Sequence, residues 1–136
     1  MRVITGTARG RRLKELEGME TRPTTGKVKE SLFSIIQFDI EGRRVLDLFA
    51  GTGQLGIEAL SRGAKQCVFI DQRNDAVKLI RENLQVCGLT DSAVVRSGDA
   101  MAYLKSGEKF DLIFLDPPYA SGLLVKALED LSLIHI

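Results

Sequence analysis

Residues 43–63, RRVLDLFAGTGQLGIEALSRG, change their periodicity halfway along. The first part, ending at Phe49, is a short apolar run that is typical of a buried strand. From residue 54 the apolar residues recur at helical spacing, and Gly63 follows the last of them. Gly51 and Gly53 lie between the two parts, where they allow the backbone to bend tightly. The stretch therefore predicts a strand, a tight glycine loop and a helix.

The same alternation continues along the rest of the chain. Strands are expected at 43–49, 65–71, 93–98 and 110–116, and helical segments at 54–63, 74–88, 100–107 and 122–131. Strands separated by helical crossovers favour a parallel sheet with helices on both faces, and the crossovers are right-handed. The predicted fold is therefore a doubly wound α/β sheet.

The segment before residue 43 is different. Residues 2–5 and 11–16 alternate around a turn, which predicts a β-hairpin or an extended arm. Thr24 or Thr25 can cap a following helix. The apolar residues of this helix at helical spacing are Val28, Leu32, Ile35 and Ile36.

Composition excludes several classes of protein. The chain has 136 residues, 44% of them hydrophobic, which suits one globular domain. No apolar run approaches the roughly 18 residues of a membrane span, and the N-terminus lacks the apolar region of a secretory signal. A cytoplasmic protein is therefore expected, with Cys67 and Cys87 as reduced thiols. With one histidine and no CxxC motif, a zinc site has no support.

Charge is distributed unevenly. Residues 1–29 hold eight basic and three acidic side chains, whereas residues 30–136 hold 11 basic and 15 acidic. A basic arm on a mildly acidic body suggests that a polyanion meets one end of the molecule, although a merely solvated hairpin is the alternative. The basic residues of the arm are Arg2, Arg9, Arg11, Arg12, Lys14 and Arg22.

Aspartates lie at the carboxyl ends of the expected strands, where ligands bind in open α/β sheets. Asp47 ends the first strand, Asp71 the second and Asp116 the fourth, and Asp99 follows the third. Asp71 could accept hydrogen bonds from both hydroxyls of a ribose. A helix N-cap or a solvated strand end is the alternative for these acids, above all for Asp99.

The segment GTGQLG also fits the GxGxxG dinucleotide fingerprint. A nicotinamide oxidoreductase or a non-catalytic nucleotide-binding module is therefore an alternative. Asp47 argues against a dinucleotide ligand. A carboxylate at this position would repel a pyrophosphate but suit the amine and sulfonium of an amino-acid cofactor.

Two consecutive prolines follow the fourth strand in Asp116-Pro117-Pro118-Tyr119. Proline ends a strand, so by itself the motif could be only a turn. Together, DLFAGTG, Asp71, GDA at 98–100 and DPPY at 116–119 resemble the S-adenosylmethionine-dependent amino-methyltransferases. More closely, RVITGTARGRRL, RPTTGKVKESLFSII and VLDLFAGTGQLGIEALSRGA resemble the bacterial small-subunit rRNA guanine-N2 methyltransferase family. The resemblance runs from Arg2 to about Asp130.

This resemblance implies a Rossmann-like class I methyltransferase that binds S-adenosylmethionine, releases S-adenosylhomocysteine and needs no metal. The cofactor-binding residues that it implies are Asp47, Phe49, Gly51, Thr52, Gly53, Asp71, Asp99 and Ala100. The catalytic residues that it implies are Asp116, Pro117, Pro118 and Tyr119. Arg22 and the basic arm would contact RNA.

The chemical groups of the DPPY residues suit the methylation of an amine. The lone pair of the guanine amine is delocalised into the ring, and acceptors for both N–H groups would localise it. The Asp116 carboxylate and the Pro117 carbonyl are two such acceptors, held by a rigid loop. Tyr119 could stack on a flipped-out base. Adenine or another amine in DNA or RNA is an alternative substrate.

The resemblance also predicts the organisation of the chain. Residues 1–24 would form the RNA-binding arm and residues 25–136 the catalytic domain. The C-terminus departs from the family, because the chain stops soon after Tyr119 and LSLIHI at 131–136 reads as a non-native apolar tail. This suggests a C-terminal truncation with missing strands and gives His135 no role. The expected partner is 16S rRNA or the assembling small subunit. A monomer is expected, with association possible through the exposed sheet edge.

Overall fold

A parallel sheet in the order β3-β2-β1-β4 lies at the centre of the computed structural model, which describes residues 1–15 and 26–115. The strands are β1 (Arg44–Leu48), β2 (Gln66–Asp71), β3 (Ala93–Ser97) and β4 (Leu112–Leu115). The interior residues of β1 and β2 are buried without alternation, as expected where both faces of a sheet are covered. The predicted doubly wound α/β fold is confirmed.

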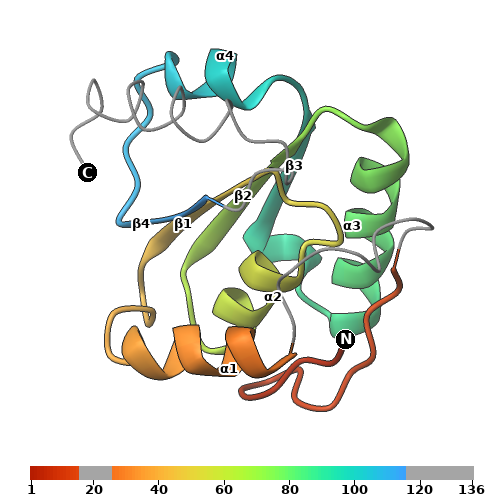
Figure 1. The fold of residues 1–136 in the computed structure, drawn as a ribbon, viewed down its shortest axis with the longest axis vertical. Coiled ribbons are helices and arrows are strands. Elements are labelled where there is room, and N and C mark those ends of the chain that lie inside the picture. The colour runs from red at the N-terminus through yellow and green to blue at the C-terminus, as the bar shows by residue number, and fades with distance from the viewer. Residues whose placement is uncertain (16–25, 116–136) are drawn as a thin grey trace.

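Helices cover both faces of this sheet (Figure 1). They are α1 (Gly26–Ile35), α2 (Gln54–Ser61), α3 (Asn74–Cys87) and α4 (Ala100–Leu104), with a 3₁₀ turn at Thr90–Ser92. Successive strand residues point to opposite faces. Val45 and Phe69 therefore pack toward α1, α2 and α3, whereas Leu46 and Val68 pack toward α4. In the described part of the chain, no helix has the length and apolar character needed to cross a bilayer.

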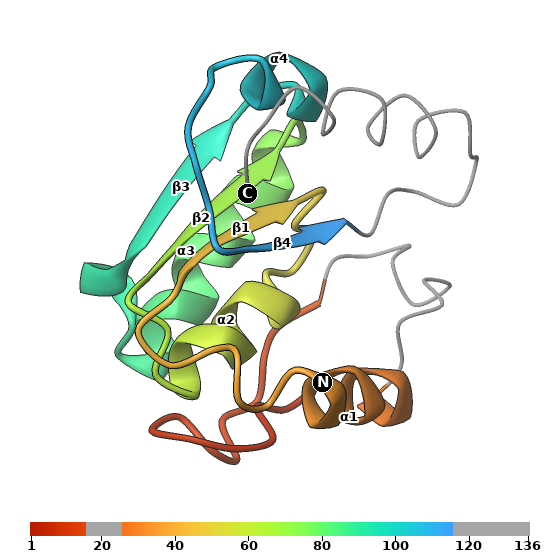
Figure 2. The same ribbon diagram turned by 90° about the vertical axis from the view of Figure 1, so that its left-hand side faces the viewer.

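The N-terminal arm is a short hairpin that lies against the ends of α2 and α3 (Figure 2). Its two sides form one antiparallel bridge, between Arg2 and Arg12, and Val3 N–H donates to the Arg11 carbonyl at 2.9 Å. Val3, Ala8 and Leu13 are buried and join the core beside α2. The arm is therefore anchored by apolar side chains, while its basic side chains remain outside.

Backbone hydrogen bonds attach the arm to α2. The Glu58 carboxylate accepts from Ile4 N–H at 2.8 Å and from Thr5 N–H at 3.1 Å. Ser61 Oγ accepts from Ala8 N–H at 3.0 Å and donates to the Thr5 carbonyl at 2.6 Å. These two polar side chains are buried, so they give the hidden N–H groups of the arm the partners they need.

The buried face of α1 differs from the face that the apolar pattern predicts. Val28 and Ile35 are 52% and 79% exposed, whereas Lys29 and Phe33 are fully buried. Phe33 packs on Phe114 and under the Arg62 guanidinium, and Lys29 forms an ion pair with Glu58 at 3.1 Å. Of the four apolar residues at helical spacing, Leu32 and Ile36 pack against the core, whereas Val28 and Ile35 do not, because a buried acid on α2 selects the lysine side of the helix.

Gly6 and Gly10 provide a matched test of how the arm docks. Both have positive φ, +93° and +86°. A Cβ on Gly6 would lie 1.8 Å from the Ser61 carbonyl oxygen, whereas a Cβ on Gly10 would meet nothing within 4 Å. We expect Gly6→Ala to detach the arm from α2, and Gly10→Ala to cost only the backbone strain of about 1–2 kcal/mol.

Hydrogen exchange of the amides of Ile4, Thr5, Thr7 and Ala8 measures this docking, because all four donate to Glu58 or Ser61. Their protection should be lost in Gly6→Ala and kept in Gly10→Ala. Equal protection in the two variants would contradict the docked arrangement.

Candidate active site

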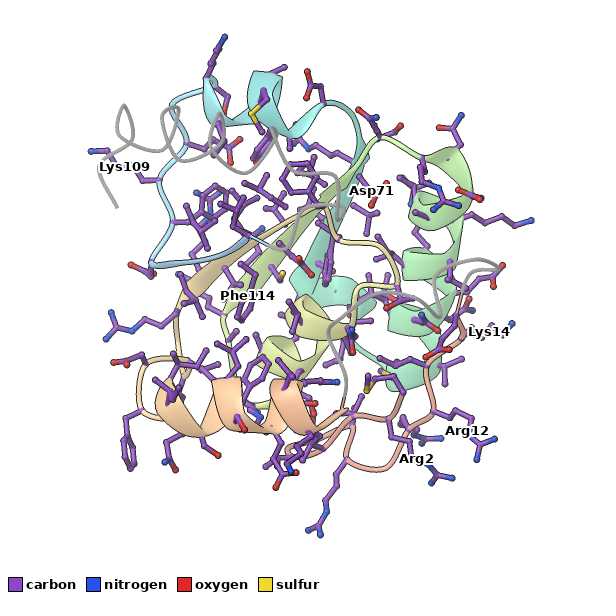
Figure 3. The ribbon with its side chains drawn as sticks, in the orientation of Figure 1. Arg2, Arg12, Lys14, Asp71, Lys109 and Phe114 are labelled. Carbon is purple, nitrogen blue, oxygen red and sulfur yellow. The ribbon has the colours of Figure 1, made fainter. Side chains whose placement is uncertain are left out.

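The loops that follow β1, β2 and β3 meet at one edge of the sheet. Leu48, the last residue of β1, is in register with Ile70 in β2 and with Leu115 in β4, and Asp71 is in register with Ser97. Strand ends aligned in this way bring the loops after β1, β2 and β3 together. Asp71 lies at this edge in Figure 3.

The loop after β1 has an unusual backbone. Phe49, Gly51 and Gly53 all have positive φ, at 56°, 62° and 82°. Phe49 is the one non-glycine residue with positive φ in the part of the chain that the structure describes. A bulky residue in this conformation is strained, and such strain is concentrated at functional sites. The loop is closed by a 2.8 Å hydrogen bond from Gly53 N–H to the Ala50 carbonyl.

Asp47 lies beneath the first turn of α2. Asp47 is 1% exposed, and its carboxylate accepts from Gly56 N–H at 3.0 Å. Burial, together with this charge, raises the pKa of the neighbouring Cys67 thiol well above its ordinary value. A negative charge here neutralises the positive end of the dipole of α2. A pyrophosphate would need that positive end to bind. The position therefore favours a positively charged ligand group over a dinucleotide.

Asp71 joins the loops after β1 and β2. One carboxylate oxygen accepts from Gly51 N–H and the other from Arg73 N–H, each at 2.9 Å. A carboxylate has about four acceptor positions, so further acceptor capacity remains for ligand hydroxyls. Asp71 is half-buried at the crevice.

Asp99 caps α4, since its Oδ1 accepts from Met101 N–H at 3.0 Å. The N-cap that its sequence context allows is therefore present. Asp99 is exposed and Ala100 is buried, in the loop directly after β3. Its proposed contact with adenine stays a prediction.

Gln54 is a residue that sequence reasoning gave no role. It is the first residue of α2, and its Oε1 is buried and has no hydrogen-bond partner among residues 1–15 and 26–115. A buried acceptor without a donor costs free energy, and a ligand N–H would satisfy it. This acceptor and the Asp47 carboxylate suit a ligand that carries an ammonium group.

The residues predicted to act on the substrate amine lie outside the described residues. These are Asp116, Pro117, Pro118 and Tyr119. Arg22, which was predicted to contact RNA, also lies outside the described residues. The last described residue of β4, Leu115, pairs with Leu48, which directly precedes the strained loop. The described end of β4 therefore lies beside the loop of the candidate cofactor site.

Five of the six predicted basic residues of the arm lie in the described hairpin. Arg2, Arg9, Arg11, Arg12 and Lys14 are all exposed. Figure 3 shows Arg2, Arg12 and Lys14 projecting outward from the arm at one corner of the molecule. Lys14 forms a weak exposed ion pair with Glu82 at 3.4 Å. The arrangement offers positive charge along an exposed hairpin.

Sequence reasoning missed the buried polar residues that hold the arm, namely Lys29, Glu58 and Asn83. A signal existed for Asn83, because it lies between Ile80 and Leu84 on the buried face of α3. A polar residue on an apolar stripe needs a partner. No comparable signal marks Lys29, since a lysine near a helix start is usually solvated.

Comparisons with known proteins show which family the chain belongs to. A family model described as "Conserved hypothetical protein 95" matches residues 1–135. The chain is 50% identical over 123 residues to the Bacillus subtilis protein named "Putative rRNA methyltransferase YlbH", covering 88% of this chain and 67% of that protein. It is 37% identical over 134 residues to Escherichia coli "Ribosomal RNA small subunit methyltransferase D", covering 96% and 67%. The chain thus spans about two thirds of the length of these relatives.

A solved structure named "Putative methyltransferase yhhF from Escherichia coli" matches with a TM-score of 0.86 at 32% identity, covering 97% of this chain and 71% of that chain. The fold predicted by the resemblance, a Rossmann-like class I methyltransferase, is confirmed. The chain belongs to the Conserved hypothetical protein 95 family, together with the proteins named ribosomal RNA small subunit methyltransferase D.

Proposed function

We propose that this chain carries the catalytic machinery of a methyltransferase acting on the exocyclic N2 amine of a guanine in 16S rRNA. The observation that carries the proposal is the convergence of the strained loop after β1, the Asp47 and Asp71 carboxylates and the end of β4 at one edge of the sheet. The small-subunit relatives named above support rRNA as the substrate.

The residues at this edge fit S-adenosylmethionine. The loop at 49–53, with Asp47 beneath it, would hold the methionine part, whose ammonium group matches the acceptors of Asp47 and Gln54. Asp71 would accept from the ribose hydroxyls, and Asp99 and Ala100 would face the adenine. When bound, the cofactor supplies a methyl group on a positively charged sulfur and leaves as S-adenosylhomocysteine.

The residues after β4 would prepare the substrate. The Asp116 carboxylate and the Pro117 carbonyl accept from the two N–H groups of the guanine amine, and Pro118 keeps the loop rigid. Tyr119 stacks on the flipped base. Asp116 receives the proton that the amine releases when it is methylated. Positioning and electrostatics supply the catalysis, and no covalent enzyme intermediate is needed.

RNA would be held by residues 1–24, while residues 25–136 form the catalytic domain. The exposed basic residues of the arm would contact phosphates, with Arg22 at the edge of the active site. The target guanine would be in a loop or bulge, where it can leave the stack.

The experiment that tests the proposal is methyl transfer from labelled S-adenosylmethionine to unmethylated small subunits and to bare 16S rRNA. Digestion of the RNA should place the label in N2-methylguanosine. Label in N6-methyladenosine would instead support the alternative amine. Equilibrium titration should show binding of S-adenosylmethionine and no binding of NAD, and the reverse result would favour the oxidoreductase interpretation of GTGQLG.

The basic arm leads to a separate prediction. The double variant Arg11→Glu/Arg12→Glu is expected to weaken RNA binding, because fewer RNA phosphates are then neutralised. The slope of log affinity against log salt should fall by about one for each phosphate that the arm no longer neutralises. S-adenosylmethionine affinity measured without RNA should stay the same, because the arm side chains are outside the strained loop.

A matched control is Lys105→Glu/Lys109→Glu, which makes the same change of charge on exposed residues. Lys109 is on the opposite side of the molecule from Arg12 in Figure 3. Both affinities can be measured by filter binding and calorimetry over a series of salt concentrations. An equal loss of RNA affinity in the two double variants would mean that net charge, and not the arm, determines RNA binding.

A further inference from the structure

Asn83 is a buried amide that contacts two parts of the molecule at once. It lies on α3 and is 1% exposed. Its Oδ1 accepts from Lys14 N–H at 2.8 Å, and its Nδ2 donates to the Lys14 carbonyl at 3.1 Å. The same Nδ2 donates to the Thr52 carbonyl at 3.0 Å. One side chain therefore binds the backbone of the arm and the backbone of the loop after β1.

These three hydrogen bonds use both N–H groups of the amide and its oxygen, so the side chain has one favourable orientation. Two of the three bonds are to Lys14. If the Lys14 backbone moves, Asn83 loses the pair of bonds that orients its amide, and the bond to Thr52 is no longer held in place. The other arm anchors, Glu58 and Ser61, lie on α2 and bind the backbone of the arm between residues 4 and 8.

We propose that Asn83 is a positioning residue that couples RNA binding at the arm to cofactor binding at the loop. This inference depends on the proposed function. The arm is already docked in the structure, so the coupling does not require it to leave. RNA bound along residues 2–14 restrains the Lys14 backbone, which fixes the Asn83 amide and through it the Thr52 carbonyl, and the loop at 49–53 is then ordered for S-adenosylmethionine.

Coupling of this kind is reciprocal for equilibrium binding. RNA should tighten binding of the cofactor by the same factor by which the cofactor tightens binding of RNA. Typical coupling between two sites is about 5- to 150-fold, and one shared side chain places the expected value near the lower end, at about 10-fold.

The test measures the affinity of S-adenosylhomocysteine by calorimetry, with and without saturating unmethylated 16S rRNA. In the unaltered chain, RNA should tighten binding about 10-fold. Asn83→Asp keeps the shape and can still accept from Lys14 N–H, but it can donate neither to the Thr52 carbonyl nor to the Lys14 carbonyl. Its affinities for S-adenosylhomocysteine with and without RNA should agree within about two-fold, against the roughly 10-fold coupling expected above.

Ser61→Ala is the matched control, because it removes two hydrogen bonds to the arm and leaves Asn83 intact. It should weaken RNA binding and retain the coupling factor. A purely structural role of Asn83 would lower both affinities and leave their ratio unchanged, so the ratio separates the two roles.

A second measurement on the unaltered chain needs no variant. RNA alone should slow hydrogen exchange of the Gly51 and Gly53 amides, which donate within the loop region. Binding of both ligands without mutual effect would overturn the coupling and leave the proposed function intact. Failure of S-adenosylhomocysteine to bind at all would overturn both.

Discussion

Asp116→Ala is expected to lower the rate of methyl transfer by about 10²- to 10⁴-fold while S-adenosylmethionine affinity stays within a few-fold. The carboxylate is proposed to accept from the guanine amine and to take its proton, so the loss should appear in the chemical step. The residues proposed to hold the cofactor lie at the ends of β1, β2 and β3, whereas Asp116 directly follows β4. Single-turnover kinetics with 16S rRNA and calorimetry with S-adenosylmethionine measure the two effects.

Two further variants sharpen this experiment. Asp116→Asn keeps an acceptor oxygen without the charge, so its rate should lie between those of the unaltered chain and Asp116→Ala. Asp111→Ala removes a carboxylate at the opposite end of β4, where Asp111 accepts from Arg44 N–H at 2.9 Å, and it should leave the rate of transfer unchanged. Near-normal turnover of Asp116→Ala would refute the proposed role of the loop.

Among all the substitutions proposed for this protein, Glu58→Gln should lower the free energy of unfolding the most. The Glu58 side chain is completely buried and accepts from Ile4 N–H and Thr5 N–H, and it forms ion pairs with Lys29 at 3.1 Å and Arg62 at 2.9 Å. A glutamine keeps the shape but places an amide NH₂ against one of these donors. It also leaves the buried Lys29 without its counter-charge. Removing one partner of a buried ion pair costs about 3–5 kcal/mol, a large part of an ordinary folding free energy.

Urea unfolding and hydrogen exchange of the arm amides measure this effect. Glu82→Gln is the matched control, because Glu82 makes only an exposed contact with Lys14 at 3.4 Å, and such pairs contribute about 0–1 kcal/mol. Adding Lys29→Met to Glu58→Gln should recover part of the stability, since the buried lysine charge is then removed as well. If both single variants lose the same small amount of stability, Glu58 is not the anchor of the arm.

The cluster of Glu58 with Lys29 and Arg62 also makes the stability of the fold depend on pH. Burial alone would raise the pKa of Glu58, but hydrogen bonds from Ile4 N–H and Arg62 and the charge of Lys29 outweigh it and hold the pKa below its ordinary value. The unfolded chain therefore binds this proton at a higher pH than the folded chain does. The stability that Glu58 contributes is fully present at neutral pH and is lost as pH falls through its folded pKa.

Local patterns predicted most of the fold. The expected strand at 65–71 is observed at Gln66–Asp71, and the expected helix at 74–88 is observed at Asn74–Cys87. Both are strongly patterned segments, so their own side chains decide their conformation. The loop after β1 could also be located, because Gly51 and Gly53 adopt the positive φ that glycine permits.

Contacts between distant segments could not be predicted in this way. Glu58 binds Ile4 and Thr5 across 54 and 53 positions, and Asn83 binds Lys14 across 69. The apolar pattern of α1 placed Val28 and Ile35 inward, yet Lys29 is the buried residue because its partner comes from α2.

The amino-acid order by itself determined the alternation of strands and helices and the place of the glycine loop and the aspartates, because periodicity and backbone preference act over a few neighbouring residues. Tertiary structure alone decided which polar side chains are buried and what they hold. A buried charge or amide is stable only beside partners that folding brings from far along the chain, and for Glu58 and Asn83 those partners are the backbone of the arm.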